Sequence, residues 1–163
     1  MKKHKICIVG GGLTGLITAL VLSEKALDID LIVENKTSKN KDLRVTAISE
    51  KNVEFLKSSI KNINFKLFYP VKKINLFFEK NNQTKNFLNF DEKKNLMFFF
   101  ENKLIIEHLT KLLKKTKIKV LKKTIKSIDL AENKVFTNLS SKSYDLVVLC
   151  LGSNNCREEY IIE

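Results

Sequence analysis

A glycine-rich turn near the start of the chain constrains the fold more than any other feature. Gly10-Gly11-Gly12-Leu13-Thr14-Gly15 follows an apolar run at 6–9 and precedes an apolar-periodic stretch that begins at Leu13. This order predicts a strand, a tight turn and a helix, which is the context that a dinucleotide-phosphate site requires. The chain has five glycines, and four of them lie in this turn, so a glycine-rich composition does not explain the pattern.

The residues of the turn have separate expected roles. Gly10 lets the chain leave the strand through a turn that a Cβ would block, and Gly15 lets the helix pack close to the strand. Gly12 lets the backbone approach a pyrophosphate closely. The helix that begins at Leu13 and Thr14 then directs free N–H groups and the positive end of its dipole at the phosphates.

An acidic residue follows the second apolar run. The run at 29–33 ends at Glu34, about 20 residues past the glycine motif, where an acid accepts hydrogen bonds from ribose hydroxyls. An acid at this position favours a ribose without a 2′-phosphate, and therefore FAD or NAD over NADP. Two alternatives involve no ligand. The glycine turn could belong to a βαβ unit that binds no phosphate, and Glu34 alone could be a solvated residue at the end of a strand.

Composition sets limits on the remaining possibilities. The length of 163 residues fits one domain, or one domain with a small appendage. Three cysteines and the absence of a signal-peptide pattern predict a cytoplasmic protein. His4 and His108 are isolated, so no metal site is expected. The net charge of +12 comes almost entirely from lysines spread along the whole chain, which argues against a nucleic-acid partner.

Periodicity predicts an α/β core interrupted by a mostly β insertion at 65–100. We expect Pro70 to mark a bend at the entry of this insertion, and we expect its many phenylalanines to form an ordinary core. The expected helices are 13–26, 49–60 and 102–115, and the expected strands outside the insertion are 5–9, 29–34, 118–121, 124–130, 134–138 and 144–151.

Four stretches of this sequence are similar to one family. They are Ile8 to Gly15 with Glu34, Asp42-Leu43-Arg44-Val45-Thr46-Ala47-Ile48-Ser49, Phe100-Glu101-Asn102-Lys103-Leu104, and Tyr144 to Gly152. Together they resemble the N-terminal half of class A flavin monooxygenases, closest to the hydroxylases of ubiquinone biosynthesis. The resemblance implies a Rossmann-like FAD-binding domain of the glutathione-reductase type over 1–163, with a β-rich insertion from the substrate domain at 65–100.

The resemblance also implies cofactor contacts. Arg44 stands where the family has an arginine that contacts the flavin. Nearly every other cation of the chain is lysine, and the planar guanidinium of arginine offers a fork of donors that suits flavin and phosphate oxygens. Gly152 matches the glycine of the family's Asp-Gly pair. The implied cofactor-binding set is Gly10, Gly12, Leu13, Thr14, Gly15, Glu34, Arg44 and Gly152. No catalytic residue is implied.

The chain departs from the family pattern in two respects. Leu149 stands where the family has glycine and Leu151 where it has aspartate, so hydrogen bonds that the family makes near the cofactor are lost. The family's second flavin motif would lie beyond Glu163. We therefore expect FAD binding with negligible hydroxylase activity from this chain alone.

The resemblance implies hydroxylation of an aromatic ring with FAD, NAD(P)H and O₂. The expected substrate is a small aromatic molecule, a polyprenylated phenol among the options. Peripheral membrane or complex association, a second chain and a missing C-terminal half remain open. Two alternatives also remain: a non-hydroxylating FAD oxidoreductase of the same fold, and a degenerate nucleotide- or partner-binding domain without catalysis.

Overall fold

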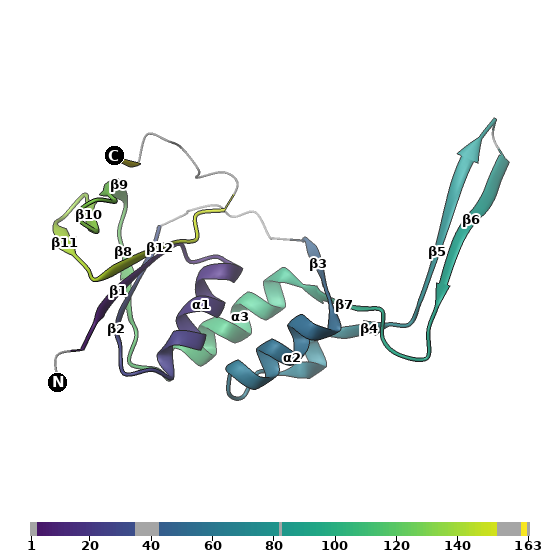
Figure 1. Ribbon diagram of the computed structural model, residues 1–163, viewed down its shortest axis with the longest axis horizontal. Coiled ribbons are helices and arrows are strands. Elements are labelled where there is room, and N and C mark those ends of the chain that lie inside the picture. The colour runs from purple at the N-terminus through teal and green to yellow at the C-terminus, as the bar shows by residue number, and fades with distance from the viewer. Residues whose placement is uncertain (1–2, 35–42, 82, 153–160, 163) are drawn as a thin grey trace. The chain divides into compact units, whose positions relative to one another are not determined.

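The computed structural model describes residues 3–34, 43–81, 83–152 and 161–162. It divides the chain into two compact units (Figure 1). The first unit comprises Met1–Lys41 and Ile106–Glu163, and the second comprises Asp42–Ile105. The segment 65–100, expected as an insertion, lies inside the second unit. The expected loop at 35–42 lies outside the described residues.

A parallel four-stranded sheet forms the centre of the first unit. Its strand order is β12-β1-β2-β8, so β1 is flanked on both sides. The strands are β1 (Lys5–Val9), β2 (Asp28–Val33), β8 (Lys119–Lys122) and β12 (Leu146–Leu149). The predicted strand at 5–9 is confirmed, whereas the strand expected over 144–151 is shorter, with Tyr144 buried just before it.

Each face of this sheet buries a different set of side chains. The register pairs Cys7 with Asp30 and Val9 with Ile32, which places these four residues on one face. The other face carries Ile6, Ile8, Ile29 and Leu31, all of them buried. Helix α1 (Leu13–Ser23) packs against β1 and β2 and buries Leu16, Ala19 and Leu20. This helix ends three residues before the predicted bound of 26.

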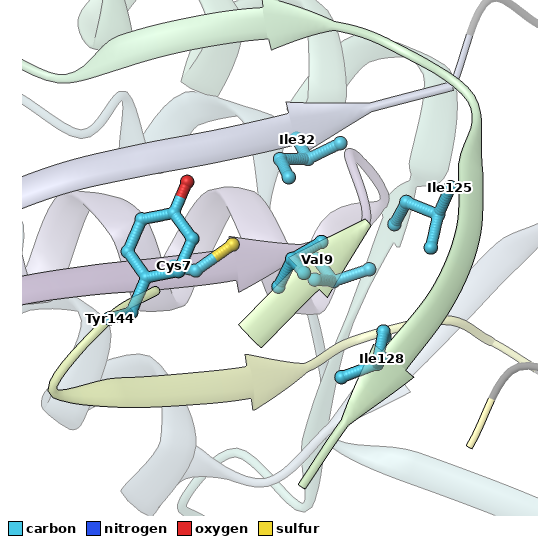
Figure 2. Close-up of a cluster of buried hydrophobic side chains, with 7 residues drawn as sticks. Cys7, Val9, Ile32, Ile125, Ile128 and Tyr144 are labelled. Carbon is cyan, nitrogen blue, oxygen red and sulfur yellow. The ribbon is translucent and has the colours of Figure 1, made fainter. Parts of the chain in front are cut away.

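The face that carries Cys7 and Val9 adjoins a second sheet. Its strand order is β11-β10-β9-β13, with β9 (Ile125–Asp129), β10 (Lys134–Thr137), β11 (Ser141–Ser143) and β13 (Ile161–Ile162). Figure 2 shows Ile125 and Ile128 of β9 in one cluster with Val9 and Ile32 of the parallel sheet. Apolar packing between the two sheets therefore forms the core on this side.

A polar group lies beside this apolar cluster. Asp30 is buried, and its Oδ2 accepts hydrogen bonds from the Tyr144 hydroxyl at 2.9 Å and from the Lys142 ammonium at 2.6 Å. The ring of Tyr144 lies next to Cys7 in the same buried cluster (Figure 2). A buried carboxylate needs such partners. This network joins β2 to Lys142 in β11 and to Tyr144, which directly follows that strand.

The second unit holds a three-stranded sheet, a helix and a hairpin. The sheet has the order β3-β7-β4, with β3 (Val45–Ile48), β4 (Tyr69–Val71) and β7 (Met97–Glu101). Helix α2 (Glu50–Ser59) begins after Ser49, whose hydroxyl caps it as predicted. A short 3₁₀ helix at Phe65–Leu67 precedes β4. Helix α3 (Asn102–Leu113) starts in this unit and continues into the first.

One expectation for the segment 65–100 is wrong, and another holds for only part of the segment. Pro70 does not mark a bend but lies within β4, where it pairs with Phe98. A proline is tolerated in this strand because β4 is at the edge of its sheet, where a missing N–H leaves no neighbouring strand unpaired. The hairpin of β5 (Lys73–Lys80) and β6 (Gln83–Asp91) exposes its phenylalanines, so they form no core. Phe68 and Phe100, by contrast, are buried with their rings 5.4 Å apart.

The cluster at Cys7 predicts a loss of stability in alkaline solution. Burial raises the pKa of the Cys7 thiol from 9.0 to about 12, and burial also raises the pKa of the Tyr144 hydroxyl. The unfolded chain therefore releases protons above pH 9 that the folded chain keeps, so the free energy of unfolding should fall between pH 9 and 12. Urea unfolding at pH 7 to 11 measures this change. Cys7→Ala should make the decline shallower, and an equal decline in this variant would contradict the assignment.

Candidate nucleotide-phosphate site

The site lies at the carboxyl ends of three neighbouring parallel strands. Strands β12, β1 and β2 are adjacent and parallel, so the residues that follow them meet at one edge of the sheet. These residues are Gly152, the glycine turn from Gly10, and Glu34. Ligands of open α/β sheets bind outside this edge. Sequence reasoning predicted these residues, and the fold of the first unit brings them to the same edge.

Gly10 is required by the backbone of the neighbouring strand end. Its φ of +118° lies in a region that L side chains rarely adopt. A Cβ at this position would also collide with the carbonyl oxygen of Cys150. The Cys150 N–H donates to the Val9 carbonyl at 2.7 Å, and the Gly10 N–H donates to the Ile32 carbonyl at 2.9 Å. The turn is therefore held between β12 and β2 by backbone hydrogen bonds.

Gly15 and Gly11 are also closely packed. Gly15 is buried in the first turn of α1, and a Cβ there would collide with the carbonyl oxygen of Gly10. A Cβ on Gly11 would lie 2.6 Å from a methyl carbon of Val33. These contacts show that the helix and the strand ends approach too closely at both positions for a side chain to enter without displacement.

Gly12 differs from the other three glycines of the turn because the space beside it is open in the described part of the chain. No heavy atom of a described residue lies within 4 Å of a Cβ built at this position, and the residue is exposed. Gly12 is the N-cap of α1, and no side chain caps the helix. The first N–H groups of a helix have no partner within it, so those of Leu13, Thr14 and Gly15 can bind a ligand at this end of α1.

Charge at this end of the helix suits an anion. The first turn of α1 contains no acidic residue, so nothing in it opposes the favourable interaction of the helix dipole with a phosphate. A ligand that fills the open space at Gly12 replaces a missing cap. The described residues of the turn thus fit the phosphates of a dinucleotide.

Glu34 and Gly152 flank the glycine turn. Glu34 directly follows β2 and is partly buried. Gly152 is exposed, has a φ of +70°, and has no heavy atom of a described residue within 4 Å of a built Cβ. Among the described residues, the space beside Gly152 is therefore open, as it is beside Gly12.

Arg44 lies in the second unit, beside a buried hydrogen-bond pair. The backbone carbonyl of Arg44 accepts from the Asn102 N–H at 3.0 Å, and the Thr46 hydroxyl donates to Asn102 Oδ1 at 2.6 Å. Asn102 is buried and is the first residue of α3. These bonds fix the start of β3, and with it the backbone of Arg44. Arg44 itself is an exposed residue.

Sequence reasoning missed the role of the strand end at Cys150. Its carbonyl and Cβ pack against Gly10 and Gly15. Leu149 and Leu151 pack against the Cys7–Val9–Ile128 cluster between the sheets, so they serve the core and bring no polar group to the site.

Comparisons with known proteins identify the fold. No protein-family model and no curated protein matches the sequence. Among solved structures, the chain is similar to the tetrameric form of 2-methyl-3-hydroxypyridine-5-carboxylic acid oxygenase, with a TM-score of 0.73 and 12% identity over 90% of this chain. It is also similar to FqzB, with a TM-score of 0.72 and 16% identity over 91% of this chain.

A third similar structure is the Diels-Alderase PyrE3, with a TM-score of 0.65 and 17% identity over 93% of this chain. This chain spans 39% of the oxygenase, 36% of FqzB and 33% of PyrE3. The first unit's parallel sheet and the β-rich second unit thus belong to a fold shared with an oxygenase. Within the described ranges, no helix is long and apolar enough to cross a membrane, and no group of His, Cys, Asp and Glu side chains could hold a metal ion.

The difference between Gly12 and Gly15 predicts opposite outcomes for two alanine variants. Gly12→Ala has room for its methyl group and an extended backbone with φ of −78°, so its free energy of unfolding should change by less than about 1 kcal/mol. The methyl group would occupy the space open to a phosphate, so nucleotide affinity should fall at least about tenfold. Gly15→Ala should lose roughly 2 kcal/mol or more of stability, because its methyl group collides with backbone.

Urea unfolding and calorimetric titration with FAD measure the two effects separately. A Gly12→Ala protein that binds FAD as well as the natural chain would contradict the placement of the phosphates. A Gly15→Ala protein of unchanged stability would contradict the packing of the turn.

Proposed function

We propose that this chain is the FAD-binding portion of a flavin-dependent monooxygenase. The open cradle at Gly12 carries the proposal, because it offers uncapped helix N–H groups at the carboxyl edge of a parallel sheet. In this proposal the turn from Gly10 to Gly15 binds the pyrophosphate. Gly152 lines the same edge of the sheet.

Two further residues favour FAD as the dinucleotide. Glu34 follows β2, where a carboxylate binds ribose hydroxyls, and a 2′-phosphate would be repelled by its charge. Arg44 supplies a guanidinium suited to the oxygens of a flavin ring or of its phosphates. Its place in the Asp-x-Arg segment, where the resembled family has an arginine that contacts the flavin, supports a flavin as the bound group.

A bound flavin would supply the redox chemistry, and the residues of this chain would bind and orient it. The helix N–H groups neutralise phosphate charge without a cationic side chain. Glu34 fixes the ribose. The backbone bonds from Cys150 and Gly10 keep the turn rigid, so the cradle exists before the ligand arrives.

At a finer level, we propose an aromatic-ring hydroxylase that uses NAD(P)H and O₂, in ubiquinone biosynthesis. The sequence resemblance of the Asp42–Ser49 and Phe100–Leu104 segments supports this reading. So do the names of two structures with this fold, a 2-methyl-3-hydroxypyridine-5-carboxylic acid oxygenase and a peptidyl tryptophan dihydroxylase, because both names contain an aromatic compound. A small aromatic substrate follows from the proposal, with a polyprenylated phenol as one option.

The runner-up is a flavoprotein of the same fold that does not hydroxylate. The name Diels-Alderase on PyrE3 shows that this fold is not confined to oxygenases. A nucleotide-binding domain without catalysis is the third reading, favoured by Leu151 at the family's aspartate position and by its packing into the core. The third reading also includes a domain that binds only a partner, and for that domain no nucleotide binding is expected.

Direct binding tests the proposal. The purified chain should bind FAD more tightly than NADP, and Glu34→Gln should weaken FAD binding about 5- to 30-fold, because one or two hydrogen bonds to ribose weaken. Fluorescence quenching of FAD and calorimetry measure both affinities. The matched control is Glu132→Gln, an exposed acid in the turn after β9, which should leave FAD affinity unchanged. NADP binding as tight as FAD binding would sink the assignment of Glu34.

Oxygen consumption separates the hydroxylase from the alternatives. We expect the FAD-loaded chain by itself to show negligible NAD(P)H-dependent oxygen uptake with a phenolic substrate, because it spans only 39% of the oxygenase that shares its fold and 36% of FqzB. An oxygen electrode measures the rate, with free FAD as the control. Turnover well above that control would contradict this expectation and support complete catalysis by this chain.

A further inference from the structure

One side of the β5–β6 hairpin (Figure 1) combines apolar residues with two lysines. Residues that pair across the strands lie on the same side, and so do residues two apart along one strand. Phe87, the extra residue at the register shift, belongs to β6, so the alternation along β5 continues through the shift. We call this side the cationic face; it consists of Ile74, Leu76, Phe78, Lys80, Gln83, Lys85, Leu88 and Phe90.

The tip of the cationic face surrounds an open hollow. Phe78, Lys80, Gln83 and Lys85 line this hollow together with Asn81. Four residues of the face therefore border one space, which agrees with their assignment to one side on both strands. The stem of a lysine can lie along apolar surface while its ammonium group stays in water. A hollow with two ammonium groups and an aromatic ring suits an anionic group that is attached to an apolar one.

The acids of the hairpin lie on the opposite side. Glu79 pairs with Thr84, and Asp91 pairs with Lys73, with which it forms an ion pair at 3.3 Å. Among the described residues of the hairpin, the cationic face therefore carries two lysines and no acid. This charge is complementary to an anionic partner.

The apolar part of the cationic face is exposed. Leu76, Phe78, Leu88 and Phe90 are 42%, 45%, 43% and 43% exposed, respectively. A soluble polyanion such as a nucleic acid would neutralise the lysines but would leave these four side chains in water. The interface of an anionic bilayer offers phosphate groups for the lysines and an apolar layer for the leucines and phenylalanines. The combination of charge and apolar surface therefore favours a lipid surface.

We propose that the cationic face is a docking surface for the interface of an anionic bilayer. Its apolar side chains enter the boundary between headgroups and acyl chains, and Lys80 and Lys85 bind lipid phosphates. The hairpin lies in the interface and does not cross it, so the outer edges of its two strands remain in contact with water and headgroups. The surface belongs to the second unit and requires no bound nucleotide.

Sedimentation with vesicles of phosphatidylcholine and about 30% phosphatidylglycerol, in roughly 0.15 M salt, tests the charge of the surface. The natural chain should bind. Lys80→Gln combined with Lys85→Gln should weaken binding at least about tenfold, because each lysine near an anionic surface contributes roughly fivefold. The matched control is Lys51→Gln combined with Lys111→Gln, at two exposed helix positions. It lowers the net charge of +12 by the same amount and should weaken binding less than about twofold.

A tryptophan reporter tests insertion of the apolar part. The chain contains no tryptophan, so Phe78→Trp provides a single emitter on the cationic face. Its emission should move to shorter wavelength when vesicles are added, whereas that of Phe77→Trp, on the opposite side of the hairpin, should hardly move. Phe78→Ser combined with Leu88→Ser should weaken binding at least about tenfold, because two large apolar side chains are removed from the interface.

Several outcomes would overturn the proposal. They are a chain that does not bind the vesicles, equal weakening by the two lysine pairs, and equal emission shifts of Phe77→Trp and Phe78→Trp. A monomer–dimer equilibrium in sedimentation velocity that depends on Phe78 and Leu88 would also overturn it, and would identify a second copy as the occupant. All substituted positions are exposed, so urea unfolding should give each variant the stability of the natural chain. Phe78→Trp keeps an aromatic ring, so its result stands even where the serine variant is unstable.

Discussion

The close approach of the β12 end to the glycine turn is the constraint on which the site depends. The Cys150 carbonyl lies where a Cβ of Gly10 would be, and the Gly10 carbonyl lies where a Cβ of Gly15 would be. These contacts require a chain without side chains at both positions. They bring β12, β1 and α1 close enough to present helix N–H groups at the edge of the sheet.

Buried contacts in the first unit hold the strands that end at this edge. Apolar side chains of Val9 and Ile32 lie against Ile128 of the second sheet, and Leu149 and Leu151 extend this cluster toward the site. The Asp30–Tyr144 hydrogen bond ties β2 to the chain just before β12. The strands that end at the candidate site are thus joined both by their own ladder and by buried contacts on one face.

The sequence predicted the elements that depend on local pattern. The strand at 5–9, the helix after the glycine turn and the Ser49 cap follow from apolar periodicity and from capping chemistry. The edge-strand position of Pro70 and the exposure of Phe78 and Phe90 could not be predicted in this way, because they depend on which strands pair and on what covers a sheet face. The steric role of Cys150 was hidden for the same reason, since it joins residues about 140 positions apart in the chain.

The open space at Gly12 has a consequence for the diagnostic value of the glycine motif. Gly10 and Gly15 are needed for the chain to fold in this way, whether or not a ligand binds. A protein of this fold that had lost its nucleotide would keep both glycines and would be free to exchange Gly12 for a larger residue. Among sequences that share this turn, the residue at the position of Gly12 therefore distinguishes proteins that still bind a nucleotide from proteins that keep only the fold.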